Sequence, residues 1–128
     1  MSYLNHIGLY VKDIEASRLF FEKYFGAMSG KKYHNPRKSF SSYLLSSGNG
    51  ATLEIMTKPG LNPITDKTNN YGYAHISISV GSKEKVNEIT RCLTDDGYIL
   101  HDGPRTTGDG YYESAIIDAE GNIIEITV

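Results

Sequence analysis

The chain lacks the features that mark secreted, membrane-spanning and nucleic-acid-binding proteins. Cys92 is the only cysteine among 128 residues, so no intramolecular disulfide can form. No apolar run approaches the roughly 20 residues that span a bilayer, and the first residues do not resemble a targeting segment. The net charge is −2, and the basic residues do not gather into a long face. We therefore expect a soluble cytoplasmic protein with no membrane and no nucleic-acid partner.

What the sequence does contain is a duplication. His75 follows His6 by 69 positions, and Glu125 follows Glu54 by 71. Each of these four polar residues lies in an otherwise apolar stretch. A chain of 128 residues is one domain by size, and half of it would bury too little surface to be stable alone. The pattern predicts a single domain of two similar modules.

The first module shows a strand, a helix and three further strands. Alternating apolar residues predict a strand over 3–11. Asp13 is a helix N-cap, apolar residues at helical spacing follow, and Gly26 is the expected C-terminal stop. The three further strands are predicted over 28–33, 40–46 and 51–57, between turns rich in Gly, Asn and Pro.

The second module repeats this order. A strand is predicted over 73–80, and Ser82 then caps a helix that ends before Gly97. Strands are predicted over 98–102, 110–118 and 122–128. The fold class is therefore α+β, with βαβββ modules at 1–57 and 73–128 and a linker at 58–72.

His6, Glu54, His75 and Glu125 form a candidate metal site. A single strand histidine or glutamate is usually structural, but an ionised carboxylate in an apolar strand is unfavourable unless it is paired or metal-bound. Strand parity places all four on sheet faces turned away from the helices. Two imidazoles and two carboxylates suit zinc, nickel, cobalt, manganese or ferrous iron better than calcium or copper(I).

The motifs around these residues resemble those of the vicinal oxygen chelate superfamily, and most of all glyoxalase I. They read NHIGLYV (5–11), ATLEI (51–55), GYAHIS (72–77) and NIIEI (122–126), and the turn DAEGN (118–122) is similar to one common in that family. The resemblance implies two tandem βαβββ modules with a cupped mixed sheet, a homodimer, and one divalent ion per site, with nickel or cobalt favoured and zinc possible. It also implies a metal-dependent lyase acting on a hemithioacetal of methylglyoxal and a small thiol. Glu125 is the preferred proton-transferring base and Glu54 the second.

The sequence departs from the family pattern where the thiol would bind. Tyr10 stands where glutathione-dependent relatives typically have an arginine, and Lys58 where they often have an asparagine. Arg105 lies in the segment 103–108, where relatives have a mobile loop with a cationic side chain near the substrate. We count these three residues as candidate substrate-binding residues and expect glutathione not to be the preferred thiol.

Other functions remain open at this stage. The resemblance also admits a fosfomycin thiol transferase, an epimerase, a ring-cleaving dioxygenase, or a binding protein that holds a small molecule without turnover. His101 has no counterpart in the first module and is predicted to be a surface residue. Cys92 is expected to pack within its helix rather than act as a nucleophile.

Overall fold

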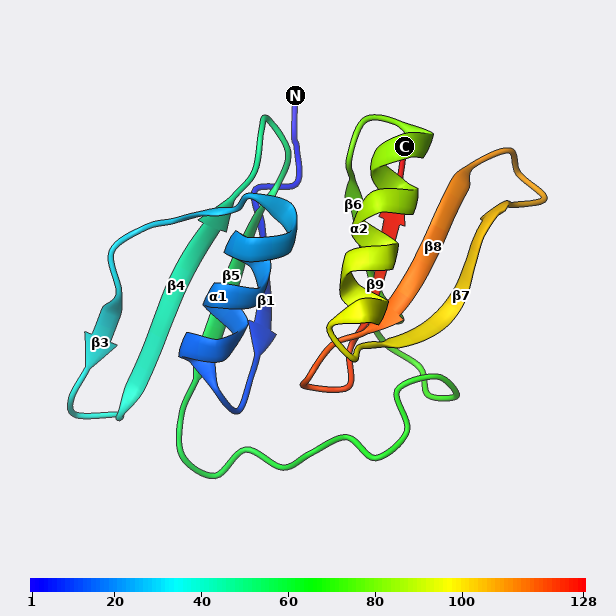
Figure 1. The fold of residues 1–128 in the computed structure, drawn as a ribbon. Helices are drawn as coiled ribbons and strands as arrows, with labels where there is room; N and C mark the ends of the chain where they lie inside the picture. The colour runs from blue at the N-terminus through cyan, green and yellow to red at the C-terminus, as the bar shows by residue number, and fades with distance from the viewer. The chain divides into compact units, whose positions relative to one another are not determined.

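The computed structural model describes all residues from Met1 to Val128. The chain divides into two compact units, Met1–Pro63 and Ile64–Val128, with the division inside the predicted linker. Each unit is a mixed sheet with one helix, as Figure 1 shows, so the predicted α+β class is confirmed. Neither helix has the length and apolar content that crossing a membrane requires.

The first unit is a five-stranded sheet in which β1 runs parallel to β5 and the other pairings are antiparallel. Its order is β1-β5-β4-β2, and β3 also pairs with β4. The elements are β1 (His6–Tyr10), α1 (Ile14–Phe25), β2 (Met28–Ser29), β3 (Tyr33–Asn35), β4 (Phe40–Ser46) and β5 (Thr52–Thr57).

The single strand predicted over 28–33 is wrong, because β2 and β3 are two separate strands. Ser29 is opposite Leu45 and Tyr33 is opposite Ser42 on the same partner strand. Three residues, 30–32, therefore separate the paired positions on the β2–β3 side, whereas two residues, 43–44, separate them on β4. The extra residue interrupts the hydrogen-bond ladder, as in a β-bulge.

Helix α1 has the predicted limits. The Asp13 carboxylate accepts a hydrogen bond from the Ala16 backbone N–H at 3.0 Å, and Gly26 adopts the left-handed conformation that ends the helix. Phe20 and Phe21 are buried, and so is Ile55 on β5. The helix thus covers the face of the sheet that carries Ile55.

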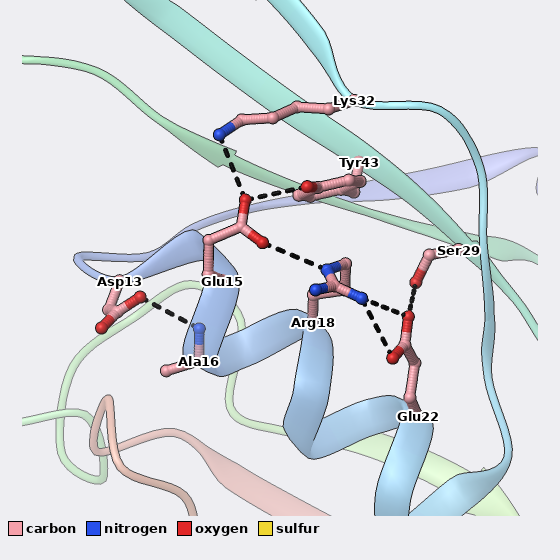
Figure 2. Close-up of polar contacts among 8 residues, drawn as sticks. All are labelled: Asp13, Glu15, Ala16, Arg18, Glu22, Ser29, Lys32 and Tyr43. Carbon is pink, nitrogen blue, oxygen red and sulfur yellow. Dashed lines mark hydrogen bonds and ion pairs between the residues drawn. The ribbon is translucent and has the colours of Figure 1, made fainter.

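A polar network also joins α1 to the strands on this side (Figure 2). Glu15 accepts hydrogen bonds from the Tyr43 hydroxyl on β4 at 2.8 Å and from the Lys32 ammonium at 3.1 Å. The Tyr43 hydrogen bond, followed by the Lys32 hydrogen bond, lowers the pKa of Glu15. Arg18 bridges Glu15 and Glu22 along the helix. These contacts hold α1 on one face and leave the opposite face without a helix.

The second unit repeats the architecture with a four-stranded sheet in the order β6-β9-β8-β7, in which β6 is parallel to β9. Helix α2 is capped by Ser82, whose hydroxyl accepts from the Lys85 backbone N–H at 3.2 Å. The elements are β6 (Ile76–Ser79), α2 (Lys83–Asp95), β7 (Ile99–Thr106), β8 (Tyr112–Ile117) and β9 (Ile123–Thr127).

The core of the second unit lies between α2 and its sheet. Val86 and Leu93 are fully buried, as are Ile116, Ile124 and Ile126 on the strands. With Thr90, Val86 and Leu93 form a stripe along the helix. Cys92 falls outside this stripe and is exposed, so the expectation that it packs in the helix interface is wrong.

Strands β6 and β7 of the second unit differ most in extent from the prediction. Strand β6 begins at Ile76, so His75 directly precedes the strand rather than lying within it. Strand β7 continues to Thr106, so Gly103–Thr106, predicted as part of a loop, belong to a strand. Pairing with β8 extends this segment, because Arg105 is opposite Glu113 and Thr106 is opposite Tyr112.

Candidate functional site

His6 and Glu54 come together on the face of the first sheet that α1 does not cover. In the parallel pairing of β1 with β5, His6 is opposite Thr52 and Gly8 is opposite Glu54, so His6 and Glu54 are diagonal neighbours. Their closest atoms, His6 Nε2 and Glu54 Oε2, are 3.6 Å apart. Both side chains are partly exposed, which leaves this face of the pair accessible to a ligand.

Asn5 orients His6, a role that the sequence did not suggest. The Asn5 amide oxygen lies 2.8 Å from His6 Nδ1. Because an amide oxygen only accepts hydrogen bonds, Nδ1 is the donor in this contact, and in the neutral ring Nε2 then has the lone pair that could bind a metal. Metal-binding histidines commonly have such a second partner. The polar residue immediately before the histidine was the available signal.

His75 and Glu125 form the equivalent pair in the second unit. Glu125 is opposite Ser77 in the parallel pairing of β6 with β9, and His75 precedes Ser77 by two positions. His75 Nε2 and Glu125 Oε2 are 3.2 Å apart. The opposite face of β9 carries the buried Ile124 and Ile126. The structure therefore brings the predicted ligands together in two pairs, one in each unit.

The donor atoms fit a divalent transition ion. Two nitrogen or oxygen ligands bonded at about 2.0–2.2 Å, with angles between octahedral and tetrahedral values, lie roughly 2.8–3.6 Å apart. The 3.2 Å separation in the His75 pair falls within this range, and the 3.6 Å separation in the His6 pair is at its upper end. Neither unit gathers three or more His, Cys, Asp or Glu side chains around one point. Each unit thus supplies two of the four predicted ligands.

Tyr10 and Lys58, the two departures from the family pattern, contact one another. The Lys58 ammonium lies 5.3 Å from the centre of the Tyr10 ring, a cation–π contact. Tyr10 is on the same face of β1 as His6. A positive charge therefore remains beside the position where relatives have an arginine, but it comes from the end of β5.

A cavity of about 360 Å³ opens on the second unit beside the His75–Glu125 pair. His75 and Glu125 line it, together with His101 and Asp102 from β7. Lys67 and Thr68, from the segment that precedes β6, form another part of the wall. The volume is in the range of small-molecule sites. Polar and titratable groups converge here on a space that α2 does not cover.

A β-bulge places two adjacent residues of β7 in this cavity. Leu100 is opposite Ile116 and Asp102 is opposite Ala115, so His101 is an extra residue in the ladder. Because a bulge breaks the alternation of side chains, His101 and Asp102 both line the cavity. His101 is exposed, as expected, but its place in the cavity was missed because strand alternation gave no sign of the bulge.

Arg105 does not line the cavity directly. Its guanidinium forms an ion pair with Asp102, with Nη2 and Oδ2 2.8 Å apart. The Arg105 hydrogen bond lowers the pKa of Asp102. Arg105 thus reaches the cavity through Asp102. Glu113, opposite Arg105 on β8, has a pKa raised first by burial and then by the negative charge of Glu125.

Comparisons with known proteins agree with this architecture. The uncharacterized protein YqjT of Bacillus subtilis (strain 168) is 32% identical over 114 residues, which cover 85% of each protein. Among solved structures, the trypanothione-dependent glyoxalase I of Leishmania major has a TM-score of 0.79 at 19% identity, over 99% of this chain and 86% of that chain. The fosfomycin resistance protein FosX of Listeria monocytogenes has a TM-score of 0.75 at 20% identity, over 100% of this chain and 92% of that chain.

The two solved structures share the fold, and their different names show that the fold alone does not select an activity. The sequence model of one family matches nearly the whole chain, over residues 3–126. The chain belongs to the glyoxalase/bleomycin resistance protein/dioxygenase superfamily.

Proposed function

We propose that the protein is a metal-dependent lyase of the glyoxalase I type, which isomerises a hemithioacetal of methylglyoxal and a small thiol. The observation that carries this proposal is the pair of facing histidine and glutamate side chains in each unit, His6 with Glu54 and His75 with Glu125. By resemblance, this full set favours glyoxalase I, because ring-cleaving dioxygenases and fosfomycin thiol transferases of the superfamily use two histidines and one glutamate. When bound, a divalent ion supplies a Lewis acid for charge on two adjacent substrate oxygens.

In this proposal Glu125 is the residue that transfers the proton. Its carboxylate removes the proton from carbon 1 of the hemithioacetal and returns it to the neighbouring carbonyl carbon, carbon 2. The hydroxyl proton of carbon 1 passes to the oxygen of carbon 2, so that carbon 1 becomes the thioester carbonyl and carbon 2 becomes a secondary alcohol. Glu125 is favoured over Glu54 because it lines the cavity on the second unit. The side chain of Glu125 is 21% exposed, so water has limited access to it.

The proposal is tested by metal analysis followed by an assay. The purified protein is reconstituted with nickel, cobalt or zinc, and its metal content is measured. Each form is then assayed with methylglyoxal and several thiols. Turnover that depends on the metal supports the proposal. If no metal form turned over methylglyoxal with any thiol, the protein would instead catalyse another reaction of the superfamily or bind a small molecule without turnover.

We further propose that the site forms in a homodimer, with the His6/Glu54 pair of one chain meeting the partner's His75/Glu125 pair. Each single variant His6→Ala and Glu125→Gln should then be inactive. Mixing the two should restore about a quarter of the parent activity, because half of the randomly formed dimers contain one intact site. The measurement is activity after the two variants are mixed under conditions that exchange subunits.

The matched control for this mixing is His6→Ala with Glu54→Gln. Both changes affect the same half of the site, so no combination of these chains contains an intact site. Recovery in the control, or a monomer by sedimentation at micromolar concentration, would contradict the shared site.

The Tyr10–Lys58 contact leads to a prediction about the thiol. Tyr10 removes a charge-assisted hydrogen bond that an arginine would make to a glutathione carboxylate, so glutathione should not be the best thiol. A double variant, Tyr10→Arg with Lys58→Asn, should improve kcat/KM for the glutathione hemithioacetal by about tenfold to a hundredfold, since such bonds contribute roughly 1.5–3 kcal/mol. The measurement is kcat/KM for several thiols.

The double variant is needed because Lys58 lies over the Tyr10 ring. Tyr10→Arg alone places two cations side by side and loses the cation–π contact, so it should gain less. Tyr10→Phe keeps an aromatic ring beneath Lys58 and is the control without new charge. If the parent protein had its highest kcat/KM with the glutathione hemithioacetal, this interpretation of Tyr10 and Lys58 would be wrong.

A further inference from the structure

Lys67 is held at the wall of the cavity by contacts to the turn between β8 and β9. Its ammonium donates to the Glu120 backbone carbonyl at 2.9 Å and to the Asn122 side-chain oxygen at 2.8 Å. The segment predicted as a linker is therefore docked on the second unit at this point. Both Lys67 and the following Thr68 line the cavity that contains His75 and Glu125.

Asp66 gives this segment a defined conformation. Its Oδ1 atom accepts hydrogen bonds from the Thr68 backbone N–H and hydroxyl, each at 2.9 Å, and from the Asn69 backbone N–H at 3.1 Å. The polar groups around Lys67 are thus organised before any ligand arrives. Such preorganisation favours binding because fewer groups must be ordered on association.

The charge of Lys67 is not neutralised by an ion pair. Its two acceptors are a carbonyl and an amide oxygen, both uncharged, whereas an ammonium has three N–H donors. Asp118 interacts with Lys67 electrostatically, but its Oδ1 atom accepts from the backbone N–H groups of Glu120 and Asn122. The other nearby cation, Arg105, is paired with Asp102. Lys67 is the cation of this wall that has a donor left for a ligand.

We propose that Lys67 forms an anion subsite of this cavity, which binds a carboxylate carried by the substrate. The subsite rests on the proposed function and specifies its substrate as the hemithioacetal of a small thiol acid. The Lys67 ammonium donates its remaining N–H to the carboxylate, whereas the hydroxyl of Thr68 in the same wall already donates its hydrogen to Asp66 Oδ1. The opposite end of the substrate then faces the His75–Glu125 pair.

Binding is tested with two probes of nearly equal size, 3-(methylthio)propionate and its uncharged amide, titrated into the intact protein by calorimetry or NMR. The carboxylate should bind about tenfold more tightly than the amide, since the charged hydrogen bond is stronger, and high salt should weaken only the carboxylate. Lys67→Met should remove the difference. Lys67→Arg should retain most of it, and Lys85→Met, on the helix side of the sheet, should leave it unchanged.

Equal affinity of the parent protein for both probes would overturn the subsite. An equal loss for both probes in Lys67→Met would also overturn it, because Lys67 would then act only by holding the segment in place. Circular dichroism of each variant identifies any unfolded protein, and Lys67→Arg then serves as the deciding variant.

Turnover separates the subsite from the proposed function. With methylglyoxal hemithioacetals of 3-mercaptopropionate and 3-mercaptopropionamide, Lys67→Met should raise KM about tenfold for the acid only. Carboxylate-selective binding without any turnover would support the subsite and contradict the lyase. Efficient turnover without preference for the acid, in binding or in KM, would support the lyase and overturn the subsite.

Discussion

Glu125→Gln is expected to lower kcat for the hemithioacetal by about 10²- to 10⁴-fold, the usual contribution of a positioned general base. Glutamine keeps the size of the side chain but cannot accept the proton. Glu125 is on the face of β9 opposite Ile124 and Ile126, so the core should be unaffected. The measurement is kcat, and circular dichroism and metal content show whether the variant is folded and loaded with metal. The rate at which the carbon-bound proton of the substrate exchanges in deuterated water should fall in parallel with kcat.

Glu113→Gln is the matched control. Glu113 lies on the neighbouring strand β8, close enough for its pKa to respond to the charge of Glu125, but its cross-strand neighbours are Arg105 and Thr127 rather than a histidine. Its replacement should change kcat by no more than a few fold. If Glu113→Gln were as damaging as Glu125→Gln, the general base would have to be reassigned.

His6→Ala and His75→Ala are each expected to weaken metal binding by more than about a hundredfold, because even partners that only orient a ligand contribute 10- to 100-fold. Each change removes the nitrogen that faces a glutamate oxygen in its pair. Metal content after reconstitution and dialysis is the measurement. Asn5→Ala should cause a smaller loss, because it only frees the His6 ring from its Nδ1 partner.

His34→Ala and His101→Ala control for the loss of a histidine as such. His34 lies in the first unit with Ser41 as its partner, and His101 lines the cavity of the second unit. Neither is paired with a predicted ligand glutamate as His6 and His75 are, so both variants should retain the metal of the parent protein. If the two single variants His6→Ala and His75→Ala both retained the metal content of the parent protein, the ion would bind elsewhere.

The features that the sequence predicted well are those whose causes are local. The limits of α1 follow from Asp13 and Gly26, which act on the backbone within a few residues. The alternation of strands β1 and β5 predicted that His6 and Glu54 share a face, because strand side chains alternate with a period of two. The motifs around the four predicted ligands pointed to the superfamily that the chain belongs to.

The sequence alone determined the two-module α+β order, the helix caps and the side of each sheet on which the four predicted ligands lie. Only tertiary structure decided the split of β2 from β3, the bulge that turns His101 and Asp102 into one cavity, and the docking of Lys67. These features depend on pairing between segments distant in sequence, where one extra residue in a ladder redirects side chains. Local sequence propensities carry no information about such pairings, so the residues that line the cavity could not be predicted one by one.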